Sequence, residues 1–320
     1  MNQHERHVVF GTGPLGSWTA QALVDQGQAV TMISRSGKAP YAPAGVEIRR
    51  GDAGNSEQVA ELTQGAAAVY QCAQPAYHRW PEEFPALQES ILRGVMRSGA
   101  KLIVAENLYM YGDPQGRVLT ENTPYAAHTR KGRTRQAMTE ALFAAHARGD
   151  VRAASARGSD FYGPYEPITA GMIYQPALAG KTVNMLGRLD QPHSFTYLPD
   201  FGRALAILGT NDTGLGRAWH VPTPPPLTQR ELVDLIAAEI GRPVKVRGSG
   251  ALILSIMGLF NPGAGETVEM LYEFKQPFVM DSSAFTNAFG LQPTALREAV
   301  AATVAWNRTP AAMPTAGAHA

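Results

Sequence analysis

Cysteine is almost absent from this sequence, since Cys72 is the only one among 320 residues. One cysteine cannot form an internal disulfide, and this usage is typical of a protein in the reducing cytoplasm. An excess of charge is also lacking, because 28 basic and 27 acidic residues leave a formal net charge of +1. We therefore expect neither a nucleic-acid partner nor attachment to an anionic membrane surface.

Long apolar runs are missing as well. The most apolar stretch, ALILSIMGLF at 251–260, has about half the length that spans a bilayer, and we interpret it as a core or groove-lining helix rather than a membrane or partner-binding face. The first residues, MNQHERHVVF, pass from polar side chains directly into an expected strand and predict no signal peptide. These absences indicate a cytoplasmic globular protein with no membrane association.

The first half of the chain contains short apolar runs that alternate with helical periodicity. Strands are expected at 7–11, 29–34, 46–50, 66–73, 101–107 and 151–157, with helices between them. Parallel neighbours require crossover connections, and right-handed crossovers place helices on both faces of a sheet. The pattern predicts an α/β fold with a doubly wound parallel sheet of the Rossmann type.

The alternation breaks after about residue 165, where loop-rich segments and a proline-rich connector follow. We assign residues 1–165 to a dinucleotide-binding domain to which 190–222 return, 166–189 and 223–308 to a smaller C-terminal substrate domain, and 309–320 to a flexible tail. Later helices are predicted to begin at Asp200, at Thr228 with a capping box to Glu231, and at Thr294.

The segment VVFGTGPLG places Gly11, Gly13 and Gly16 in G-x-G-x-x-G spacing between the first strand and the first helix. The glycines allow a tight turn, a close approach of backbone to a pyrophosphate, and close packing of helix on strand. The amides of this turn, which includes Pro14 and Leu15, together with the helix dipole, favour phosphate groups. This context predicts a bound dinucleotide.

The end of the second strand indicates which dinucleotide is bound. A carboxylate there would bind ribose hydroxyls, whereas this chain has Ser34 and Arg35, with Lys38 nearby. A cation and a hydroxyl suit the 2′-phosphate of NADP(H), so we expect NADP(H) rather than NAD(H). A solvated basic loop is the alternative interpretation.

Further coenzyme contacts are expected where the third and fourth strands end. Asp52, followed by Ala53, stands where a carboxylate can bind the adenine amino group, although a turn-forming aspartate explains the same pattern. Cys72, Ala73 and Gln74 end the fourth strand at the carboxyl edge, where ligands of such sheets lie. Cys72 itself is interpreted as a small core residue and not as a nucleophile.

Several segments together resemble the extended short-chain dehydrogenase/reductases in their atypical branch, the superfamily of NAD-dependent epimerases and dehydratases. The matching segments are FGTGPLG, GDAGN, LIVAENLYMYGDP, RGSDFYGP, FTYLPDFGRAL and FGLQPTALREAVAATVAW, and the resemblance covers roughly residues 7–308. It implies that a hydride passes between a substrate carbon and the nicotinamide. In this family a Tyr transfers the proton, a Lys four residues later assists it and holds the ribose, and a Ser or Thr polarises the substrate oxygen.

Carried over by position, all three of these sites are altered. The Ser/Thr site falls on Asn107, whose amide can still donate a hydrogen bond to a carbonyl or alkoxide oxygen. Within TRKGRTR at 129–135, the Tyr site falls on Lys131 and the Lys site on Arg135. The Tyr-x-x-x-Lys motif is therefore replaced, and Arg135 can hold ribose hydroxyls or a phosphate but cannot exchange protons.

Three roles are open for Lys131. Burial beside Arg130, Arg133 and Arg135 would make it a proton donor near neutral pH. It could instead contact coenzyme or substrate without proton transfer, or belong to a basic helix start that faces solvent or an acidic neighbour.

Other candidates flank the replaced motif. Tyr109 is a proton donor if its side chain faces the cleft. The resemblance implies that Ser159 and Asp160 occupy nicotinamide-contacting and substrate-contacting places, although Asp160 as a cap of the following turn is an equal alternative. No group of His, Cys and Asp residues has metal-ligand spacing, so we expect no metal.

These observations favour an NADP(H)-dependent oxidoreductase that acts on a small carbonyl or alcohol substrate. The alternatives are a non-catalytic NADP(H)-binding redox sensor or regulator, and a nucleotide-sugar epimerase or dehydratase. The sequence leaves open whether the protein forms a homodimer.

Overall fold

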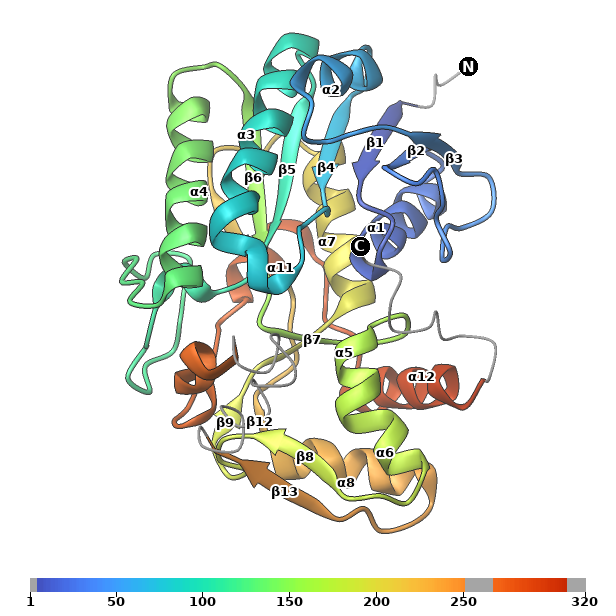
Figure 1. Ribbon diagram of the computed structural model, residues 1–320, viewed down its shortest axis with the longest axis vertical. Coiled ribbons are helices and arrows are strands. Elements are labelled where there is room, and N and C mark those ends of the chain that lie inside the picture. Colours follow the sequence, from blue (N-terminus) through green and yellow to red (C-terminus); the bar gives the residue numbers. More distant parts are fainter. Residues whose placement is uncertain (1–4, 251–266, 310–320) are drawn as a thin grey trace.

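The computed structural model of the chain describes residues 5–250 and 267–309. The helix expected at 251–260 and residues 310–320 of the expected tail lie outside these ranges. The larger lobe is built on one parallel sheet with the strand order β3-β2-β1-β4-β5-β6-β11 (Figure 1). Its strands are β1 (Arg6–Phe10), β2 (Ala29–Ser34), β3 (Glu47–Arg50), β4 (Ala68–Gln71), β5 (Lys101–Glu106), β6 (Arg152–Arg157) and β11 (Ala218–His220). This order reverses direction between β1 and β4, and it confirms the predicted doubly wound sheet.

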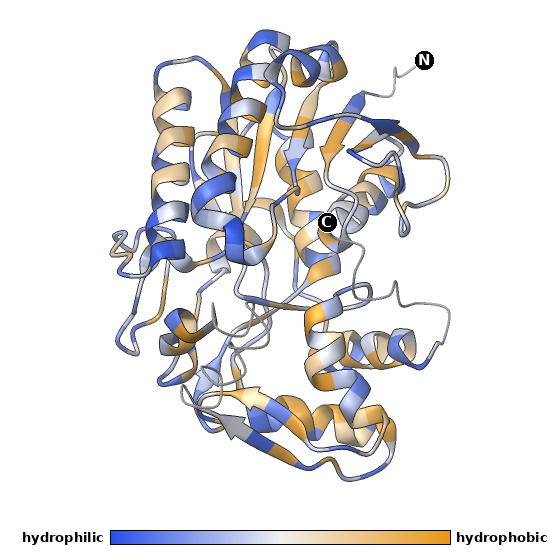
Figure 2. Cartoon of the chain, in the orientation of Figure 1, coloured by the Kyte–Doolittle hydropathy of each residue, from blue (hydrophilic) through white to orange (hydrophobic). Residues whose placement is uncertain are grey.

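Helices cover both faces of the sheet because successive strand residues point to opposite sides. One face packs on α2 (Ser56–Thr63), α3 (Trp80–Ser98) and α4 (Arg130–Ala147), and the other on α1 (Pro14–Asp25), α7 (Leu198–Thr210) and α11 (Ser283–Phe289). Val8 of β1 belongs to the first core and Val9 to the second, and both are 0% exposed. Apolar residues accordingly dominate the central strands (Figure 2).

The smaller lobe lies beyond the carboxyl ends of the strands (Figure 1). Its core joins α8 (Gln229–Ile240) and α12 (Leu296–Arg308) to the pair β8 (Val183–Leu186) and β13 (Val246–Ser249). Two further short pairs are β7 (Asp160–Tyr162) with β10 (Phe195–Tyr197), and β9 (Pro192–His193) with β12 (Leu227–Thr228). Short 3₁₀-helical segments are η1 (Tyr77–Arg79), η2 (Tyr109–Tyr111) and η4 (Val268–Phe274).

Two segments differ from the expected elements. Residues expected to be loop-rich form α5 (Pro167–Thr169), the π-helical turn η3 (Ala170–Tyr174) and α6 (Gln175–Leu178), and Glu166 caps the start by accepting from the amides of Ile168 and Thr169. The last helix begins at Leu296 rather than Thr294, because the amide and hydroxyl of Thr294 both donate to buried Asp200. The capping box of Thr228 and Glu231 is confirmed.

No helix within the two described ranges is both long enough and apolar enough to cross a membrane. The segments α7 and β11, both within 190–222, pack against the parallel sheet of the larger lobe, and the division of the chain into domains stays a prediction.

Candidate functional site

In the turn between β1 and α1, each position of the G-x-G-x-x-G fingerprint requires glycine for a different physical reason. Gly11 has a φ of +107°, which favours glycine. A Cβ on Gly16 would lie 2.0 Å from the carbonyl oxygen of Gly11, so no other residue fits there without a shift of backbone. A Cβ on Gly13 would meet nothing within 4 Å. Gly13 therefore borders open space at the start of α1, where backbone amides point outward and a pyrophosphate can approach.

A cleft of about 460 Å³ lies at the ends of β2 and β3, on the adenosine side of this turn. It is lined by Arg35, Arg50, Gly51, Asp52 and Gln58. The sequence argument identified Arg35 and Asp52 but missed Arg50, whose signal was the second arginine of RRGDAGN. Two guanidinium groups in one open cleft fit a phosphorylated ribose.

Ser34 and Asp52, two polar groups predicted for this part of the site, form hydrogen bonds within their own loops. The Ser34 hydroxyl donates to the Lys38 carbonyl at 2.9 Å. The Asp52 carboxylate accepts from the Gly54 amide at 2.9 Å, and the Gln58 side chain accepts from the Asp52 amide. Asp52 thus forms a turn, which was the alternative interpretation of its sequence pattern. Its contact with adenine stays a prediction.

Cys72 follows β4 and lies against Gly11 and Gly16 of the glycine turn. Burial raises the pKa of its thiol to about 12, against a small opposing effect of the Thr19 hydroxyl, which lies 3.7 Å from Sγ. The side chain therefore remains a neutral thiol that packs against the core. Ala73 and Gln74 continue from it, and their contact with the coenzyme stays a prediction.

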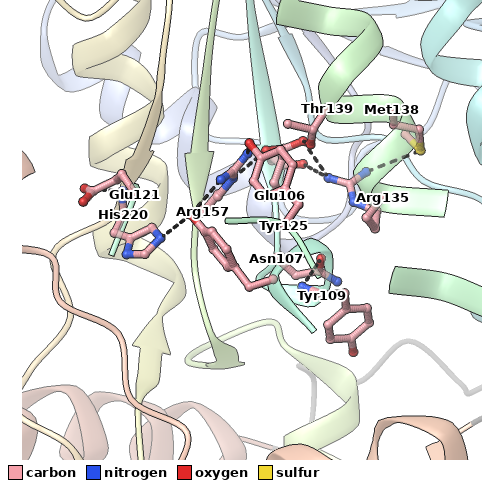
Figure 3. Close-up of polar contacts among 12 residues, drawn as sticks. Glu106, Asn107, Tyr109, Glu121, Tyr125, Arg135, Met138, Thr139, Arg157 and His220 are labelled. Carbon is pink, nitrogen blue, oxygen red and sulfur yellow. Dashed lines mark hydrogen bonds and ion pairs between the residues drawn. The ribbon is translucent and has the colours of Figure 1, made fainter. Parts of the chain in front are cut away.

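Asn107 and Tyr109 follow β5 and lie at the carboxyl edge of the sheet (Figure 3). The Asn107 side-chain oxygen accepts from the Tyr109 amide at 3.3 Å, which leaves its NH₂ group as a donor. The Tyr109 hydroxyl lies 3.3 Å from that of Tyr77, a residue the sequence argument did not single out. Burial raises the pKa of Tyr109 well above its ordinary value, and nearby Tyr77 and Glu273 raise it further, so this phenol stays neutral.

Lys131 is 0% exposed, and its ammonium faces an acid rather than the arginines the sequence suggested. Its Nζ lies 3.0 Å from the Glu269 carboxylate and 4.4 Å from the ring centre of Tyr77. Glu269 also accepts from the amides of Arg130 and Lys131 and so caps the start of α4. Of the two settings expected for a basic helix start, solvent is therefore excluded for Lys131, and an acidic neighbour is found. Its contact with coenzyme and its role in proton transfer stay predictions.

Arg135 points into the interior, toward β5, and not along the coenzyme edge (Figure 3). It is 1% exposed, donates to the Ala105 carbonyl at 3.2 Å and lies 3.5 Å from Glu106. Glu106 also pairs with Arg157 at 2.9 Å and accepts from the Thr139 hydroxyl. The exposed surface that a ribose contact requires is almost absent at Arg135, since Phe84 packs 4.8 Å from its guanidinium.

Ser159 and Asp160 follow β6 on the same edge of the sheet. The Ser159 amide donates to Thr196, while its buried hydroxyl has no partner in the described part of the chain and remains available for a ligand. The Asp160 Oδ2 lies 2.5 Å from Nε2 of His193, and its contact with substrate stays a prediction. No group of three or more His, Cys, Asp or Glu side chains that could hold a metal occurs among residues 5–250 and 267–309.

The sheet order and the glycine turn after β1 define a dinucleotide-binding α/β protein of the Rossmann class. Residues 8–221 match the NAD dependent epimerase/dehydratase family. Since this match spans more than half of the 320 residues, the chain belongs to that family.

Several known proteins are similar over nearly the whole chain. The uncharacterized protein y4nL of Sinorhizobium fredii (strain NBRC 101917 / NGR234) is 21% identical over 314 residues, covering 91% of this chain and 86% of that protein. The structure of MoeE5 in complex with UDP-glucose and NAD is 21% identical with a TM-score of 0.77, covering 95% and 98% of the two chains. The UDP-glucose 4-epimerase of Thermus thermophilus in complex with NAD is 20% identical with a TM-score of 0.77, covering 95% and 99%. At these identities the structural likeness establishes the fold.

Proposed function

We propose that this protein is an NADP(H)-dependent oxidoreductase acting on a small carbonyl or alcohol substrate. The observation that carries the coenzyme preference is the cleft in which Arg35 and Arg50 face the ribose side of the glycine turn. No carboxylate stands at the end of β2, where it would repel a 2′-phosphate. The similar solved structures hold NAD, so the choice between the two coenzymes is the decisive measurement.

The chain's own groups suit the oxygen end of such a substrate. The NH₂ group of Asn107 can donate to a carbonyl oxygen, and Tyr109, whose amide donates to the Asn107 side chain, carries a neutral phenol. The bound nicotinamide would supply or accept the hydride. The turn at Gly13 and the Ser159 hydroxyl, which has no partner among residues 5–250 and 267–309, are the features that fit such a coenzyme.

The first test is calorimetric titration of the purified protein with NADP⁺, NADPH, NAD⁺ and NADH. Removing one charge-assisted hydrogen bond to a phosphate costs roughly 1.5–3 kcal/mol, so Arg35→Ala and Arg50→Ala should each weaken NADP⁺ binding about 10- to 100-fold. Affinity for NAD⁺ should change little, because it lacks the 2′-phosphate. Arg49→Ala is the matched control, since Arg49 pairs with Glu47 on β3 outside the cleft.

Equal losses for both coenzymes in the Arg35 and Arg50 variants would contradict the preference for NADP(H). Oxidation of NADPH is then followed with a panel of aldehydes and ketones. Binding without turnover on that panel would favour the redox-sensor alternative.

A nucleotide-sugar epimerase or dehydratase is the second candidate. Family membership and the similarity to MoeE5, solved with UDP-glucose, favour it. Incubation with UDP- and dTDP-hexoses, followed by separation of the products, distinguishes it from the carbonyl reductase.

A further inference from the structure

Four aromatic rings meet beside α1, the helix that follows the glycine turn. Tyr165, which follows β7, stacks on Tyr41 with 4.4 Å between the ring centres and 11° between the ring planes. It also stacks on Trp18 of α1, at 5.0 Å and 19°. Trp306 of α12 meets the Tyr165 ring edge-on, at 4.6 Å and 88°. This aromatic cluster therefore joins α1, the loop between β2 and β3, and the last helix of the smaller lobe.

Tyr165 adopts a backbone conformation that is unusual for its residue type. Its φ is +74°, in the left-handed region that favours glycine. A bulky residue persists in this region only where its surroundings compensate the strain, and such positions gather at functional sites. The Trp18 indole donates to the carbonyl of the preceding Pro164 at 3.2 Å, so the ring that stacks on Tyr165 also holds the adjacent backbone. The cluster is thus kept in one geometry against local strain.

The loop of residues 35–46 connects the aromatic cluster with the predicted coenzyme site. It begins at Arg35, which lines the cleft of about 460 Å³, and Tyr41 is its only aromatic residue. A turn at its start is closed by the Gly37 amide, which donates to the Ser34 carbonyl at 3.2 Å. This hydrogen bond sets the local shape of the loop. Its position against the rest of the protein depends on side-chain contacts such as the stacking of Tyr41.

We propose that Tyr41 is a positioning residue for coenzyme selection, because its ring, stacked on Tyr165, holds the β2–β3 loop so that Arg35 faces the 2′-phosphate of NADP(H). This role rests on the preference for NADP(H) proposed above. A guanidinium that is already in place loses less conformational entropy on binding, which raises affinity without a new contact. NAD(H) lacks the 2′-phosphate, so its affinity should depend much less on the aromatic cluster.

Calorimetric titration of the full chain with NADP⁺ and NAD⁺ tests this role. Tyr41→Ala should weaken NADP⁺ binding about 3- to 10-fold, because an aromatic contact no longer favours the binding-competent loop position. Its affinity for NAD⁺ should stay nearly unchanged, and Tyr41→Phe, which keeps the ring, should keep both affinities. Phe289→Ala is the matched control. It also removes a partly buried ring with two aromatic neighbours, Trp219 and Phe285, but at the opposite edge of the sheet.

A double variant tests whether Tyr41 acts through Arg35. If the ring only places the guanidinium, Tyr41→Ala should cost no further NADP⁺ affinity once Arg35→Ala has removed that group. Additive losses in the double variant would overturn the proposal. Equal losses for NADP⁺ and NAD⁺ in Tyr41→Ala would overturn it as well, because a ring with a purely structural role affects both coenzymes alike.

Two further measurements keep the test decisive if Tyr41→Ala folds poorly. Tyr165→Gly removes the ring on which Tyr41 stacks, at a φ that glycine accepts, so we expect a folded protein with the same selective loss of NADP⁺ affinity. Hydrogen exchange without coenzyme should be faster at the amides of 35–46 in either variant than in the parent protein. Unchanged exchange would contradict the positioning role.

The proposed function and the role of Tyr41 can fail separately. A parent protein that binds neither coenzyme, or that prefers NAD⁺, would refute the preference for NADP(H) and this role together. A parent protein that prefers NADP⁺, with a Tyr41→Ala variant of the same preference, would refute the role of Tyr41 alone.

Discussion

The buried acid Glu106 lies between two guanidinium groups, and its charge determines whether Arg135 can occupy the interior. Burial alone would raise the pKa of this carboxyl, but Arg157 and Arg135 outweigh burial and lower it, helped by the Thr139 hydroxyl. All three charged side chains are at most 3% exposed. Loss of one partner from a buried ion group is expensive because the remaining charges are left without compensation. Arg135, the second half of the replaced motif, thus belongs to a buried ion group, and its contact with the coenzyme stays a prediction.

We expect Glu106→Gln to lower the free energy of unfolding at neutral pH by about 3–5 kcal/mol, measured by urea denaturation. Because the folded pKa is lowered, the carboxylate stabilises the protein above its unfolded pKa, and this contribution is lost as pH falls through the folded value. The difference from the parent protein should therefore shrink in acid. Glu47→Gln, at an exposed ion pair with Arg49, is the control and should cost less than about 1 kcal/mol. A similar small cost at Glu106 would contradict this account.

Single-residue patterns identified the coenzyme side of the site better than the substrate side. The glycine turn and Arg35 depend on neighbours close in sequence, so spacing was sufficient to predict them. His193 was missed because it meets Asp160 only through the tertiary fold, across a separation that spacing does not encode.

At the scale of elements, the β1–α1 turn contains one glycine that the fold requires, Gly16, and another, Gly13, that we expect coenzyme binding to require. Gly16→Ala should lower the melting temperature strongly, because its Cβ would lie 2.0 Å from the Gly11 carbonyl. Gly13→Ala should keep the melting temperature, since that Cβ meets no protein atom within 4 Å and the φ of −77° suits alanine. It should nevertheless weaken coenzyme binding, because the methyl group occupies the space of the pyrophosphate. Thermal melting and calorimetry check the pair, and full affinity in Gly13→Ala would contradict the position proposed for the phosphates.

The elements that the sequence predicted are those with a strong local signal. Strands such as β2 and β5 are continuous apolar runs, and α2 and α8 begin at side-chain caps formed by Asn55 and Thr228. The seventh strand, β11, has only three residues and is recognisable through its pairing with β6. The helical segment 167–178 was missed because it contains Pro167, Gly171 and Pro176, which normally interrupt helices.

At the scale of the whole molecule, two buried histidines at opposite ends of the strands make the free energy of unfolding depend on pH. His7 at the start of β1 is 0% exposed, and Nδ1 lies 2.9 Å from the Tyr70 hydroxyl. Burial, with a smaller effect of Lys101, lowers the pKa of His7 to about 4. His220 at the end of β11 is also buried, and burial lowers its pKa as well, against the charge of Glu121. Both imidazoles are neutral in the folded protein over a range in which the unfolded chain binds protons.

Stability should therefore decrease as pH falls from about 6.5 to about 4, because the unfolded state binds more protons than the folded state in that window. For His7 alone the loss amounts to about 3 kcal/mol, since one pKa unit corresponds to roughly 1.4 kcal/mol. Urea unfolding at several pH values measures this slope, and His7→Gln should make it shallower by about one proton. His78→Gln, at an exposed position, should leave the slope unchanged. Because β1 and β11 belong to the same sheet, protonation at either end should promote unfolding of the larger lobe as one unit, and parallel curves for the parent protein and His7→Gln would contradict this expectation.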